Sequence, residues 1–230
     1  MIPRRIALLG PVYLAGLLAA DTYVGLRGQL LLGALTWAIL ALCCIPLELR
    51  SRLVVAGVVV FATVGEATGS LLWGVYAYRL HNLPLFIPPA HGLVYLSGVA
   101  LARSLRERPL VAVAAVGSVG WALAGLTVLP RLDVAGAVGV PLLCIFLLRS
   151  RNRAAYAGVF LVVAALELYG TALGTWKWAP ALPGLGIPDG NPPSGVASGY
   201  VWFDVMAVLL AARLVTLIRG RSRRVATATA

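Results

Sequence analysis

The chain has 230 residues, of which 60% are hydrophobic and only 12% are charged. A mean hydropathy of +0.92 excludes an ordinary soluble domain, since apolar runs of about 15 to 25 residues recur from end to end, as in proteins with several transmembrane helices. The net charge of +11 does not indicate nucleic-acid binding, because no basic patch is interleaved with aromatic side chains.

Taken in chain order, the apolar runs predict eight membrane-spanning helices joined by short connections. The predicted spans are residues 6–26, 29–47, 53–76, 88–105, 110–128, 132–148, 154–176 and 196–218. The fourth and sixth spans are short for a helix that must cross about 30 Å of hydrocarbon, so seven spans are the alternative. The predicted fold class is an all-α polytopic membrane protein with about eight transmembrane helices.

The basic residues are distributed unevenly between the two sides of this topology. If the N-terminus is cytoplasmic, fourteen arginines lie on the cytoplasmic side, namely Arg4, Arg5, Arg50, Arg52, Arg103, Arg106, Arg108, Arg149, Arg151, Arg153, Arg219, Arg221, Arg223 and Arg224. The opposite side holds only Arg27, Arg79, Arg131 and Lys177. This positive-inside bias predicts a protein of the plasma (inner) membrane with both termini cytoplasmic. Residues 219–230 then form a basic cytoplasmic tail that faces anionic lipid.

The three cysteines, Cys43, Cys44 and Cys144, all fall in apolar spans. An odd number of cysteines, without paired spacing and without a nearby histidine, argues against both disulfides and a zinc site. We therefore expect neither a metal nor another cofactor.

The sequence also repeats itself. "EATGSLLWGVYAY" begins at Glu66 and "ELYGTALGTWKW" begins at Glu167, and "CIPLELRSR" at Cys44 matches "CIFLLRSR" at Cys144 with one residue inserted. "PPAHGLVY" at Pro88 resembles "PPSGVASGY" at Pro192. The matches predict two parallel four-helix repeats, residues 1–106 and 107–218, related by an axis along the membrane normal.

Three carboxylates are predicted to lie inside the membrane at similar depth. Glu66 follows Arg52 by fourteen residues, which places it about 21 Å up the third span at 1.5 Å per residue. Glu167 has the same place on the seventh span, and Asp204 lies eight or nine residues into the eighth. A carboxylate there costs at least about 2.5 kcal/mol unless it is neutral or partnered. The three acids are therefore candidate catalytic residues, and we expect them to share one cavity lined by Tyr76, Trp176 and Tyr200. The alternative is a hydrogen bond that joins helices.

His91 is a fourth catalytic candidate, because it follows Pro88 and Pro89 at the start of the fourth span, where the second copy has Ser194 and Gly195. The alternative is an ordinary hydrogen-bonding residue at the interface. Aromatic residues gather at the outer ends of the same spans, and their ring faces can stabilise a cation or form an interfacial belt. They are Trp73, Tyr76, Tyr78, Trp176, Trp178, Tyr200 and Trp202.

The stretch "APALPGLGIPDGNPPSG", residues 179–195, is rich in proline and glycine and contains Asn191. Such a composition predicts a non-helical loop. We expect it to cover the outer mouth of the seam between the repeats as a lid, with Asn191 as a further candidate substrate-binding residue.

Two of these stretches resemble a known family. "EATGSLLWGVYAYRLHNLPLFIPP" and "GTWKWAPALPGLGIPDGN" are similar to the two signature regions of the membrane carotenoid-biosynthesis hydratases, which add water to a terminal double bond of a carotenoid. The positions that fit are Glu66, Gly69, Tyr76, Tyr78, Gly174, Trp176, Trp178, Gly186, Ile187, Pro188 and Asn191. The chain departs from the family's Asn-Phe-x-Gly-Trp, where it has Asn191-Pro192-Pro193. In size and in its buried acids it also resembles the small integral-membrane terpene cyclases.

Together these features predict an integral-membrane enzyme that protonates an alkene or epoxide of an isoprenoid lipid. Glu66 or Asp204 is the expected acid, Glu167 accepts a proton or orients water, and aromatic faces stabilise the carbocation. Hydration, cyclisation and isomerisation share this chemistry. The alternatives are a proton-coupled transporter or lipid flippase and a membrane scaffold for a partner enzyme. The expected partners are an isoprenoid or other lipid substrate, membrane lipids and an enzyme of the same pathway, without nucleic acid.

Overall fold

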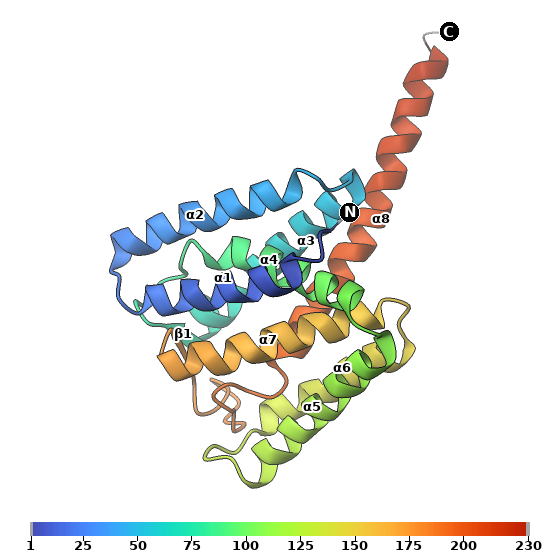
Figure 1. Ribbon diagram of the computed structural model, residues 1–230. Coiled ribbons are helices and arrows are strands. Elements are labelled where there is room, and N and C mark those ends of the chain that lie inside the picture. The colour runs from blue at the N-terminus through green and yellow to red at the C-terminus, as the bar shows by residue number, and fades with distance from the viewer. Residues whose placement is uncertain (1, 229–230) are drawn as a thin grey trace.

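The computed structural model describes the backbone of residues 2–228 and the side chains of residues 2–218, so the side chains of the predicted basic tail lie outside the described part. The chain is mostly helical (Figure 1). Its α-helices are α1 (Ile6–Asp21), α2 (Leu26–Cys44), α3 (Leu49–Glu66), α4 (Ile87–Ser104), α5 (Glu107–Thr127), α6 (Val134–Arg149), α7 (Arg153–Leu173) and α8 (Val196–Ala228).

The prediction of a helical membrane protein is confirmed in its coarser form. Within the described residues, five helical segments are long and apolar enough to cross a membrane: Leu26–Cys44, Leu49–Trp73, Glu107–Thr127, Arg153–Leu173 and Val196–Ile218. The helices α1 and α6 are apolar but shorter, with 16 residues each. The helix α4 is largely buried by its neighbours and begins with two prolines in its first turn, where proline fits because no amide donor is needed.

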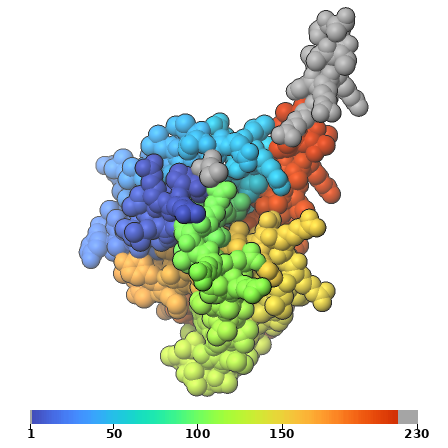
Figure 2. Space-filling view, turned by 45° about the vertical axis from the view of Figure 1, so that its right-hand side comes forward, coloured from blue at the N-terminus to red at the C-terminus, as the bar shows by residue number. Residues whose placement is uncertain are grey.

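Four helices form the centre of the molecule, with α3 packed on α8 and α4 packed on α7. The helix α1 covers α4 and α7, α2 lies on α4, and the α5–α6 pair packs against α7. Figure 2 shows the α5–α6 pair at one end of the packed body and the N-terminal helices at the other. The helices α1 and α5 therefore have different surroundings, although the sequence repeat makes them counterparts.

Small residues allow the central helices to approach closely. A Cβ atom added to Gly158 of α7 would lie 2.2 Å from the carbonyl oxygen of Gly98 in α4, so only glycine fits at this crossing. At the crossing of α3 and α8, a Cβ atom on Gly57 would lie 3.0 Å from the Cβ of Ala207. Close backbone contact of this kind is a common way for helices to associate in a membrane.

The helices α3 and α7 end differently, and both are followed by a short strand that the sequence did not predict. The helix α3 continues as a π-helix, η1 (Ala67–Trp73), and then both segments turn at a left-handed glycine, Gly74 with φ 75° and Gly174 with φ 73°. Gly74 lies eight residues after Glu66, whereas Gly174 lies seven residues after Glu167. A π-helix accommodates one extra residue, which accounts for the difference.

The strands β1 (Tyr76–Tyr78) and β2 (Trp176–Trp178) pair antiparallel, with Ala77 opposite Lys177. The prediction that helices extend to residues 76 and 176 is therefore wrong at these ends, because the chain turns at the glycines and enters the sheet. The pairing joins segments about one hundred residues apart in sequence, at the end of the molecule where α3–η1 and α7 terminate.

Candidate functional site

The two glutamates of the sequence repeat lie beneath this small sheet. Glu66 is the last residue of α3, and Glu167 lies seven residues before the glycine that ends α7. Their exposed fractions are 8% and 4%. A buried carboxylate requires partners, and the surrounding aromatic residues supply them.

Glu66 accepts hydrogen bonds from three side chains. The hydroxyls of Tyr76 and Tyr78 in β1 both donate to Oε2, at 2.5 Å, and the Nε2 of His91 in α4 lies 3.0 Å from Oε1. The alternation of a strand would ordinarily direct Tyr76 and Tyr78 to the same face, and here both converge on one carboxylate. The three donors satisfy both oxygens of an ionised carboxyl group.

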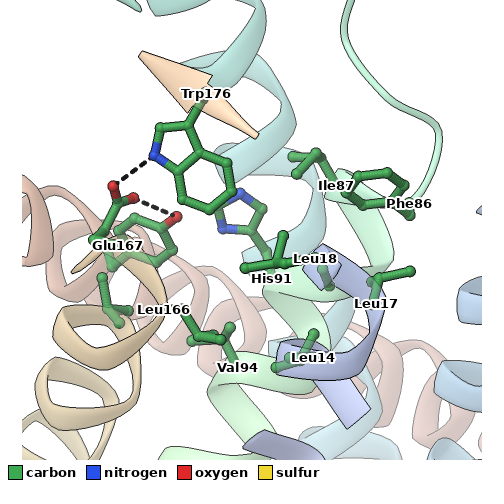
Figure 3. Close-up of a pocket in the computed structure, with 13 residues that line it drawn as sticks. Leu14, Leu17, Leu18, Phe86, Ile87, His91, Val94, Leu166, Glu167 and Trp176 are labelled. Carbon is green, nitrogen blue, oxygen red and sulfur yellow. Dashed lines mark hydrogen bonds between the residues drawn. The ribbon is translucent and has the colours of Figure 1, made fainter. Parts of the chain in front are cut away.

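Glu167 has a corresponding set of partners that is less tightly bonded. The indole of Trp176 in β2 donates to Oε2 at 2.9 Å and that of Trp178 at 3.4 Å. The hydroxyl of Tyr200 in α8 lies 3.5 Å from Oε1 (Figure 3). Around each glutamate there are thus two donors from the following strand and one from the next helix. The counterpart of His91 is Tyr200, and not Ser194 or Gly195 as the sequence repeat predicted.

Both glutamates line one cavity of about 280 Å³. Its other lining residues include the aromatic donors Tyr76, Tyr78, Trp176, Trp178 and Tyr200, and the helix residues Gly65, Ile87, Gly199 and Phe203. The rings pack against each other around it, with the centroids of Tyr76 and Trp178 4.5 Å apart. The cavity therefore presents two acids and several ring faces to whatever occupies it.

A second, smaller cavity of about 50 Å³ lies on the other side of Trp176 and Tyr200. Figure 3 shows it between Glu167, His91 and the leucines of α1. Apart from Glu167, His91 and Tyr200, its wall is apolar, and Leu14, Leu17 and Val163 are almost fully buried there. Glu167 thus borders both the roomy aromatic cavity and the narrow aliphatic one, whereas Glu66 lines only the larger.

Comparison of the chain with protein-family models, with characterised proteins and with solved structures gives no significant match.

Four candidate residues do not line these two cavities. Asp204 is 2% exposed, and its Oδ2 has no hydrogen-bond partner among the described residues. Trp73 and Trp202 are each 46% exposed at the surface, where Trp73 donates to the carbonyl of Pro183. Asn191 accepts a hydrogen bond from the amide of Trp178 at 2.9 Å, so it positions β2. The expectation that all three acids share one cavity holds for the two glutamates and not for Asp204.

Several residues that hold the site together were missed in the sequence. Asp133, which caps α6, accepts hydrogen bonds from the amides of Gly136, Gly190 and Ser194 at 2.7 to 3.0 Å. Its position just before an apolar run is the usual signal of a helix cap. Residues 179–195 are non-helical, as predicted, and Asp133 binds the end of this loop to α6.

Two arginines fix the strands to their surroundings. Arg131 donates to the carbonyls of Trp178 and Ala179, at the end of β2. Arg79, which follows β1, donates to the carbonyls of Asp21 and Val24 at the end of α1. These bonds anchor the two strands above the glutamates. A search for charged residues within the apolar spans could not have found the two arginines, because both lie between predicted spans.

Proposed function

We propose that this chain is an integral-membrane enzyme that protonates an alkene or epoxide of an isoprenoid or other hydrophobic lipid. The observation that carries the proposal is the pair of buried glutamates, Glu66 and Glu167, facing one cavity with an aromatic wall. The cavity lies within a bundle of apolar helices, so its natural occupants are hydrophobic. A protonated carboxyl group is the reagent that converts such a molecule into a carbocation.

The hydrogen bonds favour different roles for the two acids. Glu66 has three donors within 3.0 Å, which stabilise the ionised carboxylate. The partners of Glu167 are longer, at 2.9 to 3.5 Å. Because two carboxylates facing one cavity of low dielectric do not both ionise readily, Glu167 carries the transferable proton. This assignment reverses the roles that the sequence alone favoured for the two glutamates.

The proposed reaction begins when the O–H of Glu167 protonates one carbon of a double bond. A C–H bond forms, the π bond breaks, and the adjacent carbon becomes a cation that faces the rings of Tyr76, Trp176 and Trp178. Water then attacks the cation and loses one proton to the Glu66 carboxylate, which His91 orients, or a neighbouring C–H bond loses its proton to the same carboxylate. Transfer of this proton from Glu66 back to Glu167 restores the starting state. The first outcome is hydration and the second is isomerisation, while attack by a second double bond gives cyclisation.

The architecture belongs to the same proposal. Two parallel four-helix repeats are supported by the matched ends of α3 and α7 and by a strand register that maps onto itself when the halves are exchanged. Eight spans with both termini cytoplasmic in the plasma membrane are supported by the apolar runs and by the positive-inside bias of the sequence. The pairing of α3 with α8 and of α4 with α7 fits the same two-fold relation. A reporter fusion that places the two termini on opposite sides of the membrane would contradict this topology.

Deuterium incorporation tests the function. We expect lipid that co-purifies with the protein to be an isoprenoid, and purified protein in D₂O to introduce deuterium into it, as measured by mass spectrometry. Glu167→Gln should slow the incorporation by about a thousandfold. Uptake of a polar solute into vesicles without incorporation of deuterium would instead support a transporter. Co-purification of bulk phospholipid alone, again without incorporation, would support a scaffold for a partner enzyme.

A further inference from the structure

The spacing between α3 and α8 changes along their length. At Gly57 the two helices are in direct contact, since an added Cβ would lie 3.2 Å from the Cα of Ala207. Two turns further along α3, at Gly65, the nearest atoms are those of the Phe203 ring, at 2.4 Å from an added Cβ. The ring of Phe203 therefore fills the gap between the helices at the level of the glutamates, whereas the two backbones meet directly at Gly57.

This gap forms one wall of the larger cavity. Gly65, Gly199 and Phe203 all line the cavity, and Gly199 and Phe203 lie one turn apart on the same face of α8. Gly199 is also exposed at the protein surface, and no atom lies within 4 Å of a Cβ added there. The cavity thus reaches the surface beside Gly199.

The segments on the two sides of this gap carry exposed apolar side chains. Val64 of α3, Leu72 of η1 and Trp202 of α8 have exposed fractions of 61%, 82% and 46%. Side chains of this kind face hydrocarbon in a membrane protein. The aqueous end above the glutamates is by contrast closed by the paired strands and by the loop that Asp133 and Arg131 hold in place.

We propose that the gap between α3–η1 and α8 is a lateral portal through which a hydrophobic lipid chain enters the cavity from the membrane. Phe203, resting on Gly65, is the side chain that must move aside. The portal rests on the proposed function only in assuming that the occupant of the cavity is a lipid. Its test measures access to the cavity and requires no turnover.

A cysteine at the cavity wall reports this access. In a variant whose Cys43, Cys44 and Cys144 are replaced by alanine, none of which lines the larger cavity, Ile87→Cys places a thiol on its wall. Val196→Cys is a second reporter in case the first disturbs the start of α4. In proteoliposomes, neutral N-phenylmaleimide should label either thiol faster than a sulfonated maleimide, which carries the same reactive group and does not partition into hydrocarbon.

Blocking the portal supplies the decisive comparison. Gly199→Trp should slow labelling by N-phenylmaleimide about tenfold or more, which corresponds to a barrier raised by about 1.4 kcal/mol. Gly120→Trp is the matched control, because Gly120 of α5 also has open space around an added Cβ but lines neither site cavity. Phe203→Ala should accelerate labelling by the same reagent.

The proposal is overturned if Gly199→Trp leaves the rate unchanged, if the sulfonated reagent labels as fast as the neutral one, or if neither reagent labels either reporter. The first two results would assign entry to another gap between helices or to the aqueous end, and the third would show that the cavity is closed to both phases. Labelling that follows the expected pattern without deuterium incorporation would leave the portal standing and refute the proposed reaction. The two proposals can therefore fail separately.

Discussion

His91 stacks on Tyr200 with ring centroids 4.8 Å apart and an angle of 26° between the planes. His91 contacts Glu66 and Tyr200 contacts Glu167, so this stacked pair connects the hydrogen-bonded groups of the two halves. The two glutamates thus belong to one continuous polar site, although the chain supplies them from helices about one hundred residues apart.

Glu167→Gln should lower turnover by about a thousandfold, because positioned proton transfer contributes factors of about 10² to 10⁴. The amide keeps the shape of the side chain and removes the transferable proton. Deuterium incorporation from D₂O is the measurement, and Glu48→Gln, at an exposed position outside the site, is the control. A Glu167→Gln protein with full activity would contradict the assignment of the acid.

Tyr78→Phe should lower the free energy of unfolding by about 1 to 3 kcal/mol, since it leaves the buried Glu66 carboxylate with one donor fewer. The melting temperature in detergent measures the effect. Tyr23→Phe is the matched control, because Tyr23 is 90% exposed and its hydroxyl is available to water. Equal melting temperatures for the two variants would show that the phenol of Tyr78 contributes nothing to stability.

Asp204→Leu should raise the free energy of unfolding by about 1 to 3 kcal/mol, because a buried polar group without a partner carries a penalty of that size. Leucine has the same number of side-chain heavy atoms and the same branching as aspartate, and it removes the group whose Oδ2 is unpartnered. Thermal unfolding decides this prediction, and a lower melting temperature would contradict it. A variant that is stabilised but inactive would assign Asp204 a role in the reaction.

Gly158→Ala should destabilise the protein by about 1 to 3 kcal/mol, as overpacking generally does. The new methyl group would meet the carbonyl oxygen of Gly98, and the helices α4 and α7 would have to separate. Gly120→Ala, where there is open space, should leave the melting temperature unchanged or raise it slightly. Similar melting temperatures for the two alanine variants would mean that α4 and α7 adapt without cost.

The loop at residues 179–195 should be more stable in mild acid. Burial, with the nearby Asp133 carboxylate, raises the pKa of Asp189 from 3.8 to about 6, against the influence of Arg131. Between these two values the folded loop binds more protons than the unfolded one, so its stability falls as the pH rises through this window. Limited proteolysis should cut the loop faster at about pH 7.5 than at about pH 5, and Asp189→Asn should remove that difference. The Asp189→Asn variant also corrects for the pH dependence of the protease itself. If the native loop, after this correction, is cleaved at the same rate at both pH values, the prediction is wrong.

The repeat in the sequence was enough to predict that Glu66 and Glu167 share a cavity, because equivalent positions in two halves face a common axis. It was not enough to predict the strands, since "YAY" and "WKW" are too short to show a pattern and pair only with each other. Asp204 was placed from its depth alone. It lies one helical turn beyond Tyr200, about 6 Å along α8, and this displacement takes it away from the lining of the cavity.

The largest contacts between helices, α3 with α8 and α4 with α7, all connect residues before 106 with residues after it. The central helices of each predicted half therefore bury their largest interfaces against the other half. During synthesis the first half enters the membrane before α7 and α8 have been made. Glu66 and His91 therefore remain without the cover of these two helices until the rest of the chain has been inserted. Two separately expressed fragments, divided between α4 and α5, should for the same reason be unstable alone and recover the fold only when produced together.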